Sequence, residues 1–353
     1  MSMRNLAATP SKWMEGSGPY SDIVIASRIR LARNLAGLPF PTVMGRREAQ
    51  EVVDRVAAAC KTGAVQAAAG KMEVVRLEEL TVLERQILVE KHLISPQHAQ
   101  GDGYRAVVLN PEESVSLMVN EEDHLRLQVL LPALQLHESW RLATAVDDAL
   151  EAHLDFAFDE ERGYLTACPT NVGTGLRASV MLHLPGLVIA RQARRVLSAL
   201  SHVSLAVRGL YGEGTEAAGN LFQISNQVTL GRSEEEIISN LVSVTKQLIE
   251  EEKSAREMLL REAGSQLEDR VGRSFGVLSH ARVISSAEAL QLLSDVRLGL
   301  DLRLIKGVDP RVVTELMVAI QPAYLQGLAG REMDPQERDR ERAALIRQRL
   351  KGI

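Results

Sequence analysis

Three short apolar runs, separated by only a few residues each, constrain the fold of this chain more than any other feature. They are "YRAVVLN" at 104–110, "VSLMVN" at 115–120 and "HLRLQVLL" at 124–131. Connections this short join antiparallel neighbours, because parallel strands need a long crossover between them. Two further runs, at 203–210 and 221–230, have the same character. The first two thirds of the chain therefore predict an antiparallel β-sheet.

Helical patterns flank these runs and then replace them. The segment 139–154 has helical periodicity, and the last third of the chain is helical in character. Ser233 and Glu236 form a capping box ahead of a long helix, and Asp309 followed by Pro310 opens another. The predicted fold class is α+β: an antiparallel β-sheet flanked by helices, followed by an all-helical C-terminal domain.

Composition excludes several classes of protein. The 353 residues are 45% hydrophobic and 25% charged, with a net charge of −5, which is the profile of a soluble two-domain protein. Two cysteines exclude a disulfide scaffold and indicate a reducing cytosol. The N-terminus lacks the apolar core of a signal peptide, and no apolar stretch is uninterrupted enough to span a membrane. The mild acidity argues against direct nucleic-acid binding. We expect a cytoplasmic protein.

The stretch "VNEEDHLRLQV" at 119–129 is predicted to be a strand, but its head is chemically unusual. Glu121, Glu122 and Asp123 adjoin one another, and Arg126 follows three residues later. Carboxylates are poor strand formers and adjacent like charges repel. A functional role explains the cluster better than strand formation does.

A long segment of the chain is purely cationic. From residue 162 to residue 212 there is no Asp or Glu, although acids outnumber bases overall. The segment contains these arginines: Arg162, Arg177, Arg191, Arg194, Arg195 and Arg208. One interpretation is chance, with helical arginines facing water, and it suits Arg191, Arg194 and Arg195. The other is a pocket for a polyanion, because a guanidinium grips phosphate with two hydrogen bonds and keeps its charge.

A second arginine set lies upstream, in "DIVIASRIRLARN". Arg28 and Arg30 are two residues apart, so on a strand they point to the same face. Arg33 is assigned to the same set. A solvated strand face is the alternative, but the preceding apolar run "DIVIAS" indicates burial.

Four segments, in this order, resemble the guanidino kinases, the family of creatine kinase and arginine kinase. They are "SRIRLAR", "NEEDHLR", "CPTNVGTGLRASV" and "VRGLYGEGTE", and the resemblance covers roughly residues 20 to 255. The chain departs from the metabolic members because it has no separate helical N-terminal domain and gains a helical extension. In this it is similar to the bacterial protein-arginine kinases. The resemblance implies a catalytic domain at 1–255 and a helical domain at 256–353.

The resemblance assigns roles to residues of this chain. It places Glu122 and Glu213 on the guanidinium of the substrate, where carboxylates hold the cation and accept its proton. ATP is the implied phosphoryl donor, with Mg²⁺ held through the phosphates rather than by an assigned protein ligand. The implied nucleotide site comprises Arg28, Arg30, Arg126, Arg177 and Arg208. Cys168 and Asn171 are implied to lie in the substrate loop.

Other residues of the acidic cluster receive supporting roles. Glu121 and Asp123 are interpreted as supporting groups or as water-mediated magnesium contacts. His124 is interpreted as a packed residue rather than a base. Cys168 has an alternative reading as a small buried hydrophobe, the commoner fate of a lone cysteine.

The C-terminal stretch "RDRERA" at 338–343 contains Arg338, Asp339 and Arg342 on neighbouring arcs of one helix. By itself the pattern suits a solvated, salt-bridged helix. The protein-arginine kinases carry a similar element that binds phosphoarginine for regulation, so the resemblance implies an allosteric phosphoarginine site here. It also implies that the helical region forms a homodimer or larger assembly.

The resemblance predicts an ATP-dependent kinase that phosphorylates arginine residues of proteins. Expected partners are proteins with exposed arginines, a heat-shock repressor, an activator protein and a Clp ATPase whose protease degrades the marked proteins. The first alternative is a metabolic kinase for free arginine or another small guanidine, which the missing N-terminal domain opposes. The second is a non-catalytic phosphoarginine reader, which would need no nucleotide site.

Overall fold

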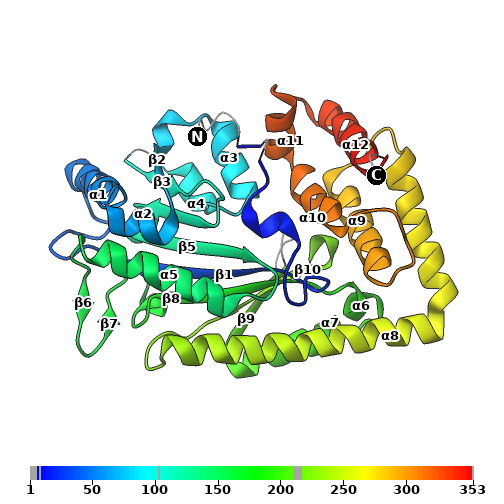
Figure 1. Cartoon of the computed structure of the whole chain (residues 1–353), viewed down its shortest axis with the longest axis horizontal. Coiled ribbons are helices and arrows are strands. Elements are labelled where there is room, and N and C mark those ends of the chain that lie inside the picture. Colours follow the sequence, from blue (N-terminus) through cyan, green and yellow to red (C-terminus); the bar gives the residue numbers. More distant parts are fainter. Residues whose placement is uncertain (1–5, 8, 102–103, 210–216, 352–353) are drawn as a thin grey trace.

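An eight-stranded antiparallel sheet forms the centre of the protein (Figure 1). The computed structural model describes residues 6–7, 9–101, 104–209 and 217–351. The strand order is β2-β3-β4-β5-β1-β8-β10-β9, which places the longest strand, β1, near the middle. The strands are β1 (Val24–Arg33), β2 (Glu73–Arg76), β3 (Ala106–Leu109), β4 (Val115–Val119), β5 (Leu125–Pro132), β8 (Leu176–His183), β9 (Leu205–Gly209) and β10 (Leu221–Asn226). A separate hairpin joins β6 (Phe158–Asp159) to β7 (Gly163–Tyr164).

The sheet confirms the fold predicted from the apolar runs. Each of the five runs forms a strand, and β3, β4 and β5 pair in sequence as antiparallel neighbours. One detail of the prediction was wrong. Residues 120–124 are the turn between β4 and β5 rather than the head of a strand, and Asn120 there has a left-handed φ of 62°. Repulsion among the adjacent carboxylates suits a turn, because their side chains can diverge there.

Helices cover both faces of the sheet, and they come from different parts of the chain. On one face, α1, α2, α5 and the first part of α8 pack against residues such as Ile29 and Leu31 of β1. On the other, α3 and the C-terminal helices pack against Ala26 of β1 and Val107 of β3. The helices are α1 (Arg46–Ala59), α2 (Gly63–Ala69), α3 (Val82–Glu90), α4 (Pro96–Gln100), α5 (Leu136–Glu151), α6 (Pro185–Ile189), α7 (Ala193–Ser198), α8 (Glu234–His280), α9 (Ser286–Asp301), α10 (Pro310–Ala319), α11 (Pro322–Ala329) and α12 (Pro335–Lys351).

Helix α8 joins the sheet region to the C-terminal helices without a linker. Its N-terminus has the predicted capping box, with Ser233 accepting from the Glu236 amide and Glu236 accepting from the Ser233 amide. The helix runs along the sheet and then bends upward (Figure 1), and Ala263 has the non-helical angles φ −141° and ψ 31°. The predicted domain boundary at 255/256 falls inside this helix, and that division stays a prediction.

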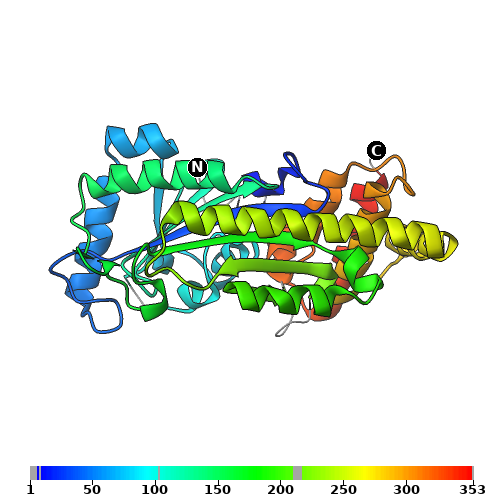
Figure 2. The ribbon, with the colours of Figure 1, turned by 90° about the horizontal axis from the view of Figure 1, so that it is seen from below.

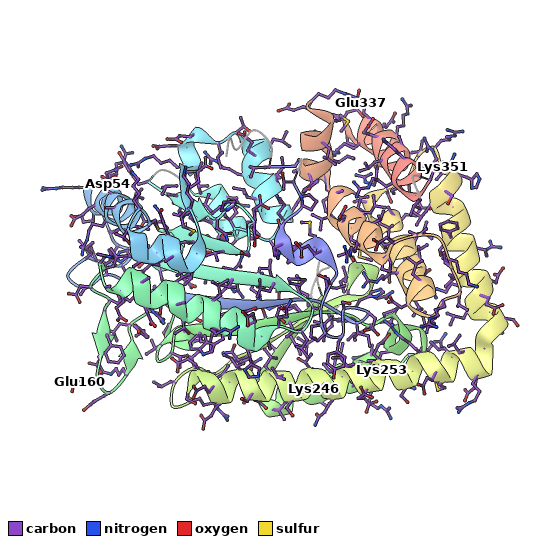
Figure 3. The ribbon with its side chains drawn as sticks, in the orientation of Figure 1. Asp54, Glu160, Lys246, Lys253, Glu337 and Lys351 are labelled. Carbon is purple, nitrogen blue, oxygen red and sulfur yellow. The ribbon has the colours of Figure 1, made fainter. Side chains whose placement is uncertain are left out.

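The C-terminal helices pack beside the sheet rather than apart from it. Figure 2 shows α8 crossing the sheet toward them, and their apolar residues share one core with Trp13 and Met14 near the N-terminus. Helix α10 begins as predicted, with Asp309 Oδ1 accepting from the Arg311 amide and Pro310 in the first turn. Glu337 and Lys351 mark the two ends of α12, and Lys246 and Lys253 lie along α8 (Figure 3). Within the described residues, no helix is both long and apolar enough to cross a membrane.

Candidate active site

A cavity of about 790 Å³ lies against the face of the sheet that carries the predicted arginines. It is bordered by the five predicted arginines and Arg105, by Glu90, Glu121 and Glu122, by the loop around Cys168 (residues 167–175, the cysteine loop) and by the ends of α3 and α4. The predicted residues that line it are Arg28, Arg30, Glu122, Arg126, Cys168, Asn171, Arg177 and Arg208. The fold therefore brings together predicted site residues that are up to about half the chain apart in the sequence.

Strand register explains why the five arginines converge. Arg30 of β1 pairs with Arg177 of β8, so both side chains leave the same face of the sheet. Arg126 of β5 pairs with Ala32 of β1, two residues beyond Arg30 and therefore on that face. At the sheet edge, Arg208 of β9 pairs with Gln223 of β10. One face thus presents guanidinium groups from four strands.

Neutral partners hold two of these guanidinium groups. Arg28 donates from Nε to Ser179 Oγ at 3.3 Å and from Nη2 to Gln223 Oε1 at 2.5 Å. Arg177 donates from Nη2 to Ser225 Oγ at 3.2 Å. Hydroxyl and amide oxygens orient the side chains without cancelling their charge, so that charge remains available to an anion.

The electrostatics of the cavity indicate an anion site. Burial, and then the neighbouring Arg177 and Arg126, lower the pKa of Arg28 to about 10. The pKa of Arg30 falls well below its ordinary value, first through burial and then through its arginine neighbours. The buried Nε atoms of Arg30 and Arg177 have no hydrogen-bond partner among the described residues. A polyanion would relieve the mutual repulsion and satisfy these donors.

The carboxylates face the arginines from the β4–β5 turn. Arg126 bridges two of them: Nη1 lies 2.7 Å from Glu121 Oε2, and Nη2 lies 2.9 Å from Glu122 Oε2. Burial raises the pKa of Glu121, but Arg126, Ser95 Oγ and the Glu122 amide together hold it below its usual value. Glu121 is buried, whereas the side chain of Glu122 is 41% exposed. Glu122 is therefore the more accessible of these two carboxylates.

The cysteine loop forms another wall. Cys168 is half-buried, and its Sγ lies 3.0 Å from Thr170 Oγ1. Thr229 Oγ1 lies 2.9 Å from the carbonyl oxygen of Thr170, which ties the loop to the segment after β10. Gly175 ends the loop with φ 63°, and a Cβ there would lie 2.6 Å from the Ala32 carbonyl oxygen, so only glycine fits.

Several predicted residues lie elsewhere. Arg33 was assigned to the arginine set, which was wrong: it lies three positions after Arg30 on β1, so its side chain leaves the opposite face and binds Asp147 at 2.7 Å. Asp123 is fully buried and lies outside the cavity lining, which favours the supporting role over a magnesium contact. His124 is packed as predicted, accepting at Nδ1 from the Leu35 amide at 2.9 Å. Glu213 lies outside the described residues.

The solvent-facing interpretation was right for part of the cationic segment. Three of its arginines are exposed on or next to α7: Arg191, Arg194 and Arg195. Arg162 is exposed in the β6–β7 turn. Only Arg177 and Arg208 of that segment reach the cavity.

Sequence reasoning missed some residues of the cavity wall. His92, just after α3, lines the cavity, and burial followed by the nearby Arg28 lowers its pKa to about 3. Gln223 orients Arg28, and Ser95 Oγ donates to Glu121 Oε1 at 2.6 Å. A lone histidine or glutamine carries no spacing signal, so only the tertiary structure identifies these residues.

The far wall of the cavity leads to the C-terminal helices. Glu90 of α3 lines the cavity, and its carboxylate accepts from the Ala323 and Tyr324 amides of α11 at 2.9 Å and 2.6 Å. Burial raises the pKa of Glu90 to about 6, while the α11 amides and then Arg342 and Arg338 act in the opposite direction. Two arginines of the predicted phosphoarginine element, Arg338 and Arg342, therefore interact electrostatically with Glu90 of the cavity wall.

Within that element, the three residues differ in accessibility. Arg342 is only 2% exposed and donates to the carbonyl oxygens of Ile320 and Ile284 at 2.8 Å and 2.9 Å. It also pairs with Asp339 at 2.5 Å. Arg338 is half-buried. Arg342 thus holds α12 against the C-terminal end of α10 and the segment before α9, which a solvated helix would not require. The phosphoarginine role of the element stays a prediction.

Comparisons with known proteins agree with this geometry. Residues 51–255 match the family described as ATP:guanido phosphotransferase, C-terminal catalytic domain, and residues 264–353 match the Protein-arginine kinase McsB C-terminal domain. The protein-arginine kinase of Moorella thermoacetica is 66% identical over 97% of this chain and 98% of its own length. That of Desulforamulus reducens is 54% identical over 100% of this chain and 99% of its own.

Two solved structures have the same fold. A lombricine kinase is 26% identical, with a TM-score of 0.57, over 73% of this chain and 71% of that one. The duplicated taurocyamine kinase of Schistosoma mansoni, with bound transition-state analogue components, is 26% identical, with a TM-score of 0.58. That match covers 67% of this chain and 34% of the duplicated protein.

Proposed function

This chain belongs to the ATP:guanido phosphotransferase family and, along its whole length, to the protein-arginine kinases; on that premise we propose that it transfers the γ-phosphoryl group of ATP to the guanidinium of arginine residues in proteins. The observation that carries the proposal is the arginine face of the cavity, bordered by Glu122. A triphosphate matches the charge and the unsatisfied donors of that face.

Different residues of the cavity have different roles in the proposed phosphoryl transfer. The arginines orient the phosphates and stabilise the charge that develops on the transferred group. A guanidinium has a pKa above about 12 and must lose a proton as the N–P bond forms. Glu122 holds this cation in line and accepts the proton, and Glu213, outside the described residues, is proposed as its counterpart. Cys168 and Asn171, which line the cavity, are proposed to border the acceptor.

Mg²⁺ fits this site through the phosphates. Magnesium is usually bound by one or two carboxylates together with substrate phosphates, where it neutralises charge. Among the described residues, no group of three or more His, Cys, Asp or Glu side chains forms a metal cluster. The proposal therefore assigns the metal to the phosphates of ATP, with no assigned protein ligand.

The acceptor distinguishes this proposal from a metabolic guanidino kinase. The relatives that match the whole chain are named protein-arginine kinases, and the C-terminal match is to the domain of that kinase. We also propose a homodimer or larger assembly in the cytoplasm and regulation by phosphoarginine at Arg338, Asp339 and Arg342. The proposed partners are a heat-shock repressor, an activator protein and a Clp ATPase.

One experiment separates the three candidate functions. The protein is incubated with labelled ATP and Mg²⁺, with casein in one reaction and free arginine in another. We expect label on casein that is labile in acid and stable in alkali, as for an N–P bond. Label on free arginine alone would indicate a metabolic kinase. Binding of phosphoarginine without any transfer would indicate a reader.

A further inference from the structure

Asn34, the residue after β1, joins three segments that are distant in the sequence. Its Nδ2 donates to Asp123 Oδ1 at 2.7 Å and to the Leu165 carbonyl oxygen at 3.0 Å. Its Oδ1 accepts from the His124 amide at 2.9 Å. Only 1% of Asn34 is exposed. One amide side chain therefore fixes the β4–β5 turn to the segment that leads into the cysteine loop.

Asp123 also links the β4–β5 turn to the cysteine loop. Its Oδ1 also accepts from the Ala167 amide at 2.7 Å, so a single carboxylate oxygen binds donors from Asn34 and from the cysteine loop. Asp123 directly follows Glu122, and Ala167 directly precedes Cys168. Glu122 and Cys168, which we propose border the acceptor, are thus the direct chain neighbours of Asp123 and Ala167, the two residues that this hydrogen bond joins.

The hydrogen bonds of Asn34 and Asp123 lie outside the cavity. Asp123 is fully buried, and neither Asp123 nor Asn34 lies in the cavity lining. Burial raises the pKa of Asp123, and the Ala167 and Asn34 hydrogen bonds counteract that rise. Burying a carboxylate is costly unless its partners are fixed. The sheet does not need this group for its own pairing, since Asp123 lies in a turn.

We propose that Asn34 and Asp123 are positioning residues that set the spacing between Glu122 and the Cys168 loop, and hence the shape of the acceptor subsite. The inference rests on the proposed function, because it assigns these residues to the guanidinium side of the reaction. Misplacing a reacting group by about 1 Å costs on the order of 100-fold in rate. Of the nucleotide arginines, Arg126 forms ion pairs with Glu121 and Glu122 of the turn, whereas Arg28 and Arg177 bind side chains of β8 and β10.

Kinetic variants test the proposal. Asn34→Ala and Asp123→Ala remove the connection, so we expect the acceptor KM to rise and kcat to fall, with a combined loss of about 10-fold or more, while the KM for ATP stays near wild type. Asp123→Asn keeps an oxygen that can accept both hydrogen bonds, so it should retain most of the activity. Loss of activity in Asp123→Asn equal to that in Asp123→Ala would show that charge, not positioning, is required.

The two cysteines provide a second measurement that does not depend on turnover. Cys60 is 1% exposed, and burial raises the pKa of its thiol to about 12, so a thiol reagent reports on Cys168 alone. Releasing the loop from Asp123 should make Cys168 react several-fold faster in Asn34→Ala than in wild type. Because this rate needs no phosphoryl transfer, it tests the connection even if the proposed function fails.

A matched control excludes a general loss of stability. Asn110 is also a buried asparagine, donating to the Ala69 carbonyl oxygen and Ser114 Oγ and accepting from the Val115 amide, but it closes the β3–β4 turn. Asn110→Ala should lower the unfolding midpoint while leaving the acceptor KM and the Cys168 rate unchanged. If Asn34→Ala behaves like Asn110→Ala in both assays, the proposal is overturned.

Discussion

Replacing Arg177 by lysine tests whether the cavity recognises the geometry of a phosphate or only its charge. Arg177 Nη2 is occupied by Ser225 Oγ, and the buried Nε has no partner among the described residues. Lysine keeps the positive charge but offers a single ammonium in place of the planar fork. It can therefore bind Ser225 or the phosphate, but not both in the geometry that Arg177 allows.

The expected loss follows from one hydrogen bond. A hydrogen bond to a charged group contributes ~1.5–3 kcal/mol, and about 2 kcal/mol corresponds to about 30-fold in kcat/KM. Burial, and then Arg208 and Arg126, already lower the pKa of Arg177. The same surroundings would disfavour a charged lysine more, because its ordinary pKa is lower, so about 30-fold is a lower bound.

The assay is ADP release at saturating acceptor, with ATP varied. Arg194→Lys is the matched control, since Arg194 is exposed on α7 and should be replaceable without loss. An Arg177→Lys enzyme with wild-type kcat/KM for ATP would refute the geometric argument. An equal loss in Arg194→Lys would mean that the substitution acts through overall charge rather than through the cavity.

Three further predictions concern other parts of the molecule. Glu122→Gln should leave ATP binding by calorimetry nearly intact but cut transfer about 10²–10⁴-fold; near wild-type turnover would remove Glu122 from the mechanism. Burial, with Arg256 and Arg297, holds the pKa of His183 well below 6.5. Below pH 6.5 this histidine is therefore protonated in the unfolded chain but neutral in the folded one. Between pH 8 and pH 5 the wild type should thus lose more unfolding free energy than His183→Gln, by up to about 2 kcal/mol at about 1.4 kcal/mol per pH unit; equal losses in urea titrations would contradict this. Arg338→Ala should abolish calorimetric binding of phosphoarginine without unfolding the protein, and unchanged binding would exclude Arg338 from that site.

Arg338 is the more accessible of the two arginines predicted for that site, because Arg342 is buried. From sequence alone, Arg338, Asp339 and Arg342 were equivalent members of one helix face. Because Arg342 is 2% exposed and binds two backbone carbonyls, its removal would disturb α12 itself. Helical spacing predicts which residues share a face, but only tertiary packing decides which of them is buried.

The five predicted strands are present because each apolar run is bounded by turns and must bury its residues, whereas β2 and β8 were not predicted. It also predicted that Arg28 and Arg30 share a face, since period-2 geometry depends only on spacing. The same rule, applied strictly, places Arg33 on the opposite face, where it binds Asp147. The turn at 120–124 was missed because strand patterning continued in the residues that follow it.

Other features could not be read from local pattern at all. Asn34 connects to residues about 90 and 130 positions away, and no periodicity or motif signals such contacts. His92 and Glu90 reach the cavity only because α3 packs between the sheet and α11 (Figure 1). Residues whose role depends on long-range packing therefore appear only in the folded structure.

The most direct test of the central claim locates the phosphate on the product. Casein is incubated with the enzyme, ATP and Mg²⁺, digested under mildly alkaline conditions, and analysed by electron-transfer fragmentation mass spectrometry. We expect phosphate on arginine side chains with the wild type, and on none with Glu122→Gln. Phosphate on serine or threonine, or on free arginine but never on casein, would contradict it.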